Sequence, residues 1–188
     1  MLVVQAAGHT CMIDIYKIFA IESSNNPLAW DKTDDSRGLG QITPGVLNDY
    51  NKAHKTNFKP NDLFKEEINT KITDWYANTE IPRLLEAFGI EDTDEHRITA
   101  YNAGIGRLSN IIKNNLELPE ITSDYIIKYK MGGDIKAGQI KLKELGFDPG
   151  KIDGKFGPNT RKAFLDFQNS TMEAPVVQRN SGIQTLKR

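Results

Sequence analysis

Glu22 is the residue whose position best suits acid–base chemistry. It follows an apolar run over residues 12–21, which predicts a buried helix. Pro27 cannot continue that helix, and Asn25 and Asn26 suit a left-handed cap, so we expect Glu22 near its C-terminal end. Burial and the negative end of the helix dipole both disfavour a carboxylate. We therefore expect the pKa of Glu22 to be raised, as a general acid requires.

Two later segments carry side chains that could bind a ligand beside such an acid. In Arg37-Gly38-Leu39-Gly40-Gln41-Ile42-Thr43-Pro44, the glycines permit a tight turn, and Gln41 offers both a donor and an acceptor to a sugar amide. In Ala100-Tyr101-Asn102-Ala103-Gly104, the phenol could orient a carboxyl group and help to hold its charge. Taken alone, the first segment is typical of an ordinary turn and the second of a core tyrosine.

Together with Glu22-Ser23-Ser24 and Asn26-Pro27, and in this order, these segments resemble the soluble lytic transglycosylase family, whose domain is related to goose-type lysozyme. The resemblance covers residues 12–130. One position departs from the family pattern. Gly40 stands where the family usually has a Met that lines the sugar groove, which predicts a changed contact and a looser turn.

The resemblance implies a mainly α, lysozyme-like catalytic domain that cleaves peptidoglycan. The bond is the β-1,4 linkage between N-acetylmuramic acid and N-acetylglucosamine, and the products are 1,6-anhydromuramic acid ends. Glu22 would be the catalytic residue and Tyr101 would hydrogen-bond it. The expected substrate-binding residues are Ser23, Ser24, Gly38, Leu39, Gln41, Tyr101, Asn102 and Tyr125.

The polar stretch over residues 28–36 decides between two reactions. It carries Asp31, Asp34 and Asp35 but lacks the alternation and the glycine of an EF-hand, so we expect a solvated loop rather than a metal site. Ordinary hydrolysis needs a second carboxylate to activate water. By the resemblance Asp35 is the possible second carboxylate, because Thr43 occupies the position after the Gln-containing turn where goose-type lysozymes are acidic. A muramidase that uses Asp35 thus stays open as an alternative to the favoured transglycosylase.

Helix-capping residues and prolines predict the remaining helices and loops of the catalytic domain. Thr43 and Pro44 suit the start of a helix that runs through Tyr50, and Thr93 or Asp92 can cap another. We expect a loop over residues 51–62 and helices over 66–88 with a kink at Pro82, 94–103, 106–115 and 121–129. The aromatic pair Trp75 and Tyr76 is interpreted as core packing and is not assigned to substrate.

After Gly132-Gly133, residues 135–168 resemble the small helical peptidoglycan-binding domain found beside many wall hydrolases. Two amphipathic helices would enclose a glycine-rich turn around a core of Phe147, Phe156, Phe164 and Phe167. The expected domains are 1–131 (transglycosylase), 132–170 (peptidoglycan-binding) and 171–188 (flexible tail). A catalytically silent wall-binding protein is the alternative of a different class.

Composition excludes several other classes. The formal net charge is -1 over 188 residues, which gives no electrostatic footprint for nucleic acid. Cys11 is the only cysteine, and His9, His54 and His96 lack metal-ligand spacing, so we expect no metal and no cofactor. Residues 1–8 are too short for a membrane span and show no export signal. We expect the protein to bind the glycan strands of peptidoglycan and to be a monomer. We expect it to act at the cell envelope, either as a secreted or as a phage-associated protein.

Overall fold

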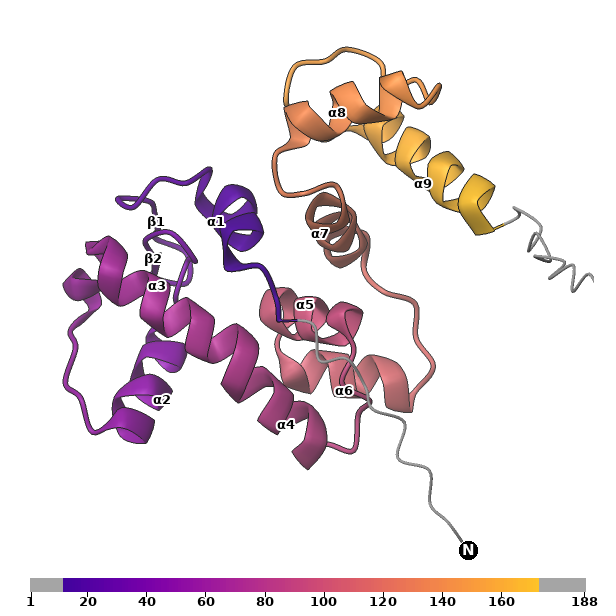
Figure 1. Cartoon of the computed structure of the whole chain (residues 1–188). Coiled ribbons are helices and arrows are strands. Elements are labelled where there is room, and N and C mark those ends of the chain that lie inside the picture. The colour runs from indigo at the N-terminus through magenta and orange to yellow at the C-terminus, as the bar shows by residue number, and fades with distance from the viewer. Residues whose placement is uncertain (1–11, 173–188) are drawn as a thin grey trace, which may run out of the picture.

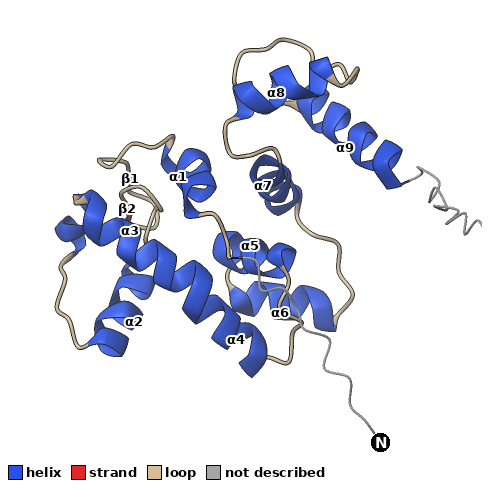
Figure 2. Cartoon of the chain, in the orientation of Figure 1, coloured by secondary structure: helices blue, strands red, loops and turns tan. Residues whose placement is uncertain are grey.

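The computed structural model describes residues 12–172, and helices make up nearly all of their regular structure (Figure 2). Helices α1 to α7 form the body of the molecule, while α8 and α9 lie together beyond α7 (Figure 1). The expected mainly helical fold is confirmed. In chain order the elements are α1 Ile15–Ser23, β1 Trp30–Asp31, β2 Ser36–Arg37, α2 Pro44–His54, η1 Pro60–Phe64, α3 Glu66–Trp75, η2 Tyr76–Glu80, α4 Ile81–Ala87, α5 Asp94–Ala103, α6 Ile105–Lys113, α7 Glu120–Lys130, α8 Ile135–Glu144 and α9 Pro158–Met172.

Helix α1 is buried on one face only. Asp14 caps its first turn by accepting the Tyr16 amide proton at 3.1 Å. Ile18 and Phe19 are buried, whereas Tyr16 is 69% exposed. The prediction of a buried helix holds for one face only, since α1 packs against α7 and α3 and leaves its other face to solvent. Two residues with left-handed backbone, Ser24 and Asn25, end the helix, so the expected left-handed cap is found at Asn25 but starts one residue earlier.

The predicted helix over residues 66–88 consists of three consecutive segments. A π turn, η2, separates α3 from α4 and lies immediately before Pro82. Proline has no amide hydrogen, and its ring crowds the carbonyl four residues earlier, so the regular hydrogen-bond ladder cannot continue through it. The expected interruption is confirmed.

Two further segments differ from the sequence prediction. Helix α2 begins as expected with Thr43 as its N-cap and continues beyond Tyr50 to His54, whose ring stacks on Tyr50 at a centroid distance of 4.0 Å. The predicted loop over 51–62 is thus partly helix, and η1 overlaps its end. The solvated stretch over 28–36 contains a short antiparallel hairpin in which Trp30 pairs with Arg37.

The body is filled by three clusters of buried side chains. The first joins α1 to α5 and α7, the second joins α2 to η1 and α3, and the third joins α4 to α5 and α6. Their fully buried members include Ile18, Ile42, Leu63, Ile72, Ile81, Leu85 and Leu108. These clusters bring the N-terminal helix α1 against the late helix α7.

Helices α8 and α9 enclose a fourth cluster with an unusual polar centre. Leu142, Ala163 and Phe164 are buried there, and Phe147, Phe156 and Phe167 pack around them, as the sequence predicted. Gln139 is 1% exposed, and its amide oxygen accepts the Gly154 amide proton at 2.9 Å. The same oxygen accepts the Asp153 amide proton, and the amide nitrogen donates to the Lys155 carbonyl and the Thr160 hydroxyl. This one side chain fixes the glycine-rich turn against α8 and α9.

Several predictions concern residues outside 12–172, namely Cys11, His9, the segment 1–8 and the tail from 173 onward. The described part of the tail, residues 171–172, belongs to α9. None of the helices within 12–172 combines the length and the apolar character that crossing a membrane would require.

Candidate active site

Glu22 lies in the last turn of α1 and is held by a residue from α7. The Tyr125 hydroxyl donates a hydrogen bond to Glu22 Oε1 at 2.7 Å, although the two residues are 103 positions apart. Tyr125 is 5% exposed and belongs to the core cluster that joins α1 to α7. The packing of these two helices therefore brings the phenol to the carboxyl group.

Burial raises the pKa of Glu22 from its usual value near 4.5 to about 7. Desolvation is the largest cause, because the charged form loses its hydration inside the protein. The hydrogen bond from Tyr125 opposes the rise, the charge of Asp34 adds to it, and the charge of Lys128 opposes it. The carboxyl group thus retains a proton over much of the neutral range, which is the state that a general acid needs.

Tyr101 does not make the hydrogen bond that the resemblance implied. Its hydroxyl donates to the Gly40 carbonyl at 2.7 Å, while Tyr125 occupies the place beside Glu22. Tyr101 nevertheless lies within electrostatic range, since Glu22 contributes to raising the pKa of Tyr101 well above its usual value, after desolvation as the main cause. This corrects the assignment of the hydrogen bond but leaves Tyr101 at the site.

The turn around Gly40 is tight, and the prediction of a looser turn is wrong. The Gly40 amide donates to the Asn69 side-chain oxygen at 2.8 Å. A Cβ on Gly40 would lie 2.2 Å from Thr73 Oγ1 and 2.9 Å from the Tyr101 hydroxyl. Thr73 and Tyr101 therefore fill the space into which a side chain at position 40 would project.

Gln41 uses its amide group to hold the hairpin together. Its nitrogen donates to the Gly38 carbonyl at 2.8 Å and to the Ala29 carbonyl at 3.3 Å, and its oxygen accepts from the Ser36 hydroxyl at 3.1 Å. Both amide protons are thus engaged within the chain. The expected donation from Gln41 to a sugar is corrected, and only its oxygen keeps acceptor capacity.

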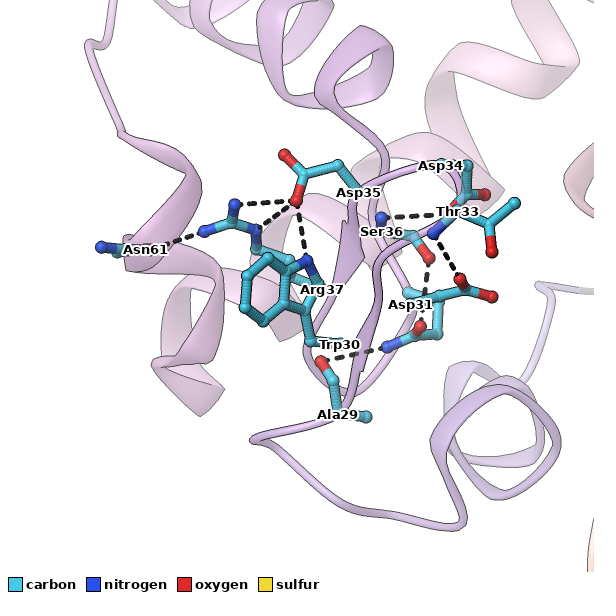
Figure 3. A network of polar contacts seen from close by, with 10 residues as sticks. Ala29, Trp30, Asp31, Thr33, Asp34, Asp35, Ser36, Arg37 and Asn61 are labelled. Atoms are coloured by element: carbon cyan, nitrogen blue, oxygen red, sulfur yellow. Dashed lines mark hydrogen bonds and ion pairs between the residues drawn. The ribbon is translucent and has the colours of Figure 1, made fainter.

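Asp35 is engaged on the outer side of the hairpin. Figure 3 shows its carboxylate accepting from the Trp30 indole and the Arg37 guanidinium, each at 2.8 Å, while Arg37 also reaches Asn61. Hydrogen bonds from Arg37 and then Trp30 lower the pKa of Asp35. The aspartate whose charge acts on Glu22 is its neighbour Asp34, which is exposed and accepts the Ser36 amide proton at 3.0 Å.

Of the other candidate residues, some support the structure around the site and one is exposed at the surface. Leu39 is buried in the core cluster of α1 and α7, and a Cβ on Gly38 would lie 2.2 Å from the Leu63 carbonyl, so both support the turn. The Ser23 hydroxyl donates back to the Phe19 carbonyl at 3.1 Å. Ser24 is exposed beside Glu22, which leaves its hydroxyl accessible.

Two hollows adjoin each other near Tyr101, which lines the smaller of them. The first has a volume of about 250 Å³ and brings together the candidate residues Gln41, Tyr101 and Asn102, together with Tyr76. Glu22 is not among its lining residues, but its charge acts on Tyr101, which is one of them. The second, about 790 Å³, shares Val46, Tyr76 and Gly104 with the first. Together they form a groove that leads away from the acid.

Trp75, Tyr76 and Arg83 also line the larger hollow, and sequence reasoning missed them. The aromatic pair lies at the junction of α3 and the π turn, where both rings contribute to the core and to the groove wall. The π turn that begins at Tyr76 is the feature that marks them, because π turns are often found at functional sites, but no sequence pattern specified that turn.

Among residues 12–172 there is no group of three or more His, Cys, Asp or Glu side chains that could hold a metal ion. The site as described consists of a buried acid, its phenol partner and a groove with polar and aromatic walls.

Comparison with known protein families agrees with this arrangement. Residues 131–171 match the model of a peptidoglycan binding domain, which covers α8, α9 and the turn between them. Residues 9–122 match the model of the transglycosylase SLT domain, which includes α1, the hairpin, the Gly40 turn and α5. No curated protein and no solved structure matches the chain. Because the transglycosylase SLT model matches more than half of its length, the chain belongs to the transglycosylase SLT domain family, and a peptidoglycan-binding module follows that domain.

Proposed function

We propose that this protein is a lytic transglycosylase. It cleaves the β-1,4 bond between N-acetylmuramic acid and N-acetylglucosamine and leaves 1,6-anhydromuramic acid ends. The observation that carries the proposal is Glu22, a largely buried carboxyl group with a pKa of about 7 and a phenol at 2.7 Å. Membership of the family supports action on peptidoglycan. The 1,6-anhydromuramic acid product and the catalytic role of Glu22 are what we propose beyond it.

In the first step Glu22 acts as the acid. Its proton passes to the glycosidic oxygen as the bond to the anomeric carbon breaks, and the substrate's own N-acetyl oxygen stabilises the positive charge on that carbon. The Tyr125 hydroxyl then stabilises the new carboxylate, because a hydrogen bond to the charged form is stronger than one to the neutral acid.

In the second step the same carboxylate acts as the base. It takes the proton from the 6-hydroxyl of the muramic acid, whose oxygen attacks the anomeric carbon and closes the anhydro ring. Glu22 ends the cycle protonated, so no water is consumed and no second protein carboxylate is required. Substrate-assisted chemistry of this kind departs from the two-carboxylate scheme of most glycosidases.

The glycan strand would occupy the groove that begins at Tyr101. Asn102 and the remaining lone pair of the Gln41 amide oxygen can bind sugar hydroxyl and amide groups at the smaller hollow. Further along, Trp75 and Tyr76 offer aromatic surface for the apolar faces of sugar rings. Arg83 lines the same hollow but is paired with Glu80 at 2.6 Å, so the two together offer a polar rim rather than a free charge.

We also propose the domain limits 1–131, 132–170 and 171–188, and action at the cell envelope as a monomer. The peptidoglycan-binding match supports the wall as the partner. Both matched families act on or bind peptidoglycan, which supports a location at the cell wall or envelope, whether by secretion or with a phage.

One observation favours a hydrolase as a second candidate. The negative charge of Asp34, in the turn of the hairpin, raises the pKa of Glu22 and so lies within electrostatic range of the acid. Inverting hydrolysis places a base about 6.5–9.5 Å from the acid, across the bound sugar. Asp34 would activate water in that reaction more readily than Asp35, whose carboxylate is held by Arg37 and Trp30.

The fragment masses after digestion of purified sacculi test the proposal. Anhydro products are one water lighter than reducing products, so mass spectrometry separates the two reactions. Glu22→Gln should abolish fragment release while keeping the fold and wall binding. Glu117→Gln, which changes an exposed carboxylate, serves as the matched control. Release of reducing ends only would favour the hydrolase, and full biological activity of Glu22→Gln would favour a silent wall-binding protein.

A further inference from the structure

Helix α7 belongs to two hydrophobic cores. Tyr125, Ile126 and Tyr129 lie in the cluster that also contains α1, whereas Ile127 lies in the cluster of α8 and α9. In Figure 1 this helix stands between α1 on one side and the α8–α9 pair on the other. A displacement of the C-terminal module thus acts directly on the helix that carries the phenol partner of Glu22.

The module holds α7 through a charged clamp. Arg161 of α9 donates to Asp124 at 2.6 Å and to Glu120 at 2.8 Å, two residues four positions apart on the same face of α7. The Arg161 and Asp124 side chains are 26% and 25% exposed, and Glu120 is 81% exposed. The pair with Asp124 is therefore the better shielded from solvent and should contribute more. Asp124 immediately precedes Tyr125.

A second contact joins the module's linker to α1. Gly133 has φ 83°, and a Cβ there would lie 2.9 Å from the Lys17 backbone of α1. On α7 itself, Lys128 lies over the Phe156 ring of the module, with its ammonium 5.4 Å from the ring centroid. The module consequently contacts both helices that form the Glu22–Tyr125 pair.

We infer that Arg161 of the peptidoglycan-binding module is a positioning residue for the catalytic acid. By anchoring Asp124 and Glu120 it fixes the first turns of α7, and through them the distance from the Tyr125 hydroxyl to Glu22. This inference rests on the proposed function of Glu22. It assigns to the module a role in the chemical step that is separate from wall binding.

Loss of the Arg161 clamp should change the pKa of Glu22 in a definite direction. The charged and titratable groups that act on Glu22 are Tyr125 and Lys128 from α7, Asp34 from the hairpin and Tyr101 from α5. Both α7 groups favour the carboxylate. Desolvation, the largest cause of the raised pKa, persists as long as the core around Glu22 stays closed to water. A shift of α7 within that closed core weakens the influence of Tyr125 and Lys128, so the pKa of Glu22 rises further and the orientation of its proton is lost.

Arg161→Ala tests this in the full chain, with Arg161→Lys as the conservative variant. Lys162→Ala is the matched control, because Lys162 neighbours Arg161 on α9 but pairs with Asp166 of the same helix. With purified glycan strands as substrate, Arg161→Ala should lower kcat about tenfold, with KM changed less than twofold. The basic limb of its kcat/KM profile should move to higher pH. Arg161→Lys should recover part of both changes, and Lys162→Ala should show neither.

A second readout does not depend on activity. The carboxyl ¹³C resonance of Glu22, assigned by its loss in Glu22→Gln, should titrate at higher pH in Arg161→Ala than in the native protein. If the resonance moves but no protein form cleaves glycan, the positioning is supported and the proposed function fails. If native protein cleaves glycan and Arg161→Ala only weakens sacculus binding or lowers Tm, with the Glu22 titration unmoved, the inference is overturned.

Discussion

Replacement of Gly40 by alanine is expected to destabilise the protein by about 2–3 kcal/mol. The new Cβ would lie 2.2 Å from Thr73 Oγ1, a distance at which the side chain or the turn must move. Thr73 is fully buried and cannot turn away freely. Overpacking of this kind costs about 1–3 kcal/mol. Displacement of the turn also weakens the hydrogen bonds of Gly40 to Asn69 and Tyr101, each worth about 1 kcal/mol.

A double-mutant cycle measured by urea unfolding isolates the contact. Thr73→Ala removes the nearest atom, so Gly40→Ala should cost at least about 1 kcal/mol less in the Thr73→Ala background than in the native one. Gly45→Ala is the control, because its Cβ would meet nothing closer than Thr43 Oγ1 at 3.8 Å and it lies in α2. It should be neutral or stabilising. A Gly40→Ala effect below about 0.5 kcal/mol, or strictly additive effects, would refute the close packing of this turn.

Three further predictions concern the acid and the module. Tyr125→Phe removes a hydrogen bond that favours the carboxylate, so the basic limb of the kcat/KM profile should move up by about one pH unit; an unmoved limb would contradict the pairing. Because the pKa of Glu22 is raised in the folded state, its contribution to stability is complete below about pH 4.5 and is lost as the pH rises through about 7. Relative to Glu22→Gln, native protein should lose up to about 3 kcal/mol of unfolding free energy between pH 4 and pH 8, as measured by urea unfolding. If the unfolding free energies of the two proteins changed with pH in parallel, Glu22 would not be a buried acid. Gln139→Ala leaves the backbone amide and carbonyl groups that this side chain bonds without partners. It should therefore lower the free energy of unfolding by about 3 kcal/mol or more and speed amide hydrogen exchange at residues 153–155. Unchanged exchange rates at these residues would contradict the role of Gln139 as the polar centre.

Features governed by neighbouring residues in the chain could be predicted from the sequence. Thr43 and Pro44 specify the start of α2, and Thr93 specifies the start of α5, because an N-cap bonds to amides two or three residues ahead. Pro82 interrupts its helix for an equally local reason. The apolar run before Glu22 correctly predicted a helix ending near that residue and a raised pKa.

Features that depend on tertiary packing could not be predicted. The partner of Glu22 is set by how α1 and α7 pack. The family resemblance indicated Tyr101, whereas the hydroxyl that reaches Glu22 is that of Tyr125. The hairpin has strands of two residues each, too short for an alternating pattern. The use of Gln41 within the turn follows from its position beside Ser36, which no spacing rule indicates.

The proposed reaction depends most on the proton of Glu22, and a ¹³C-detected titration of its carboxyl group measures that proton directly. We expect a pKa near 7, with the signal absent in Glu22→Gln. A titration near 4.5, the usual value for a glutamate in water, would mean that Glu22 is ionised at neutral pH and would contradict its role as the acid.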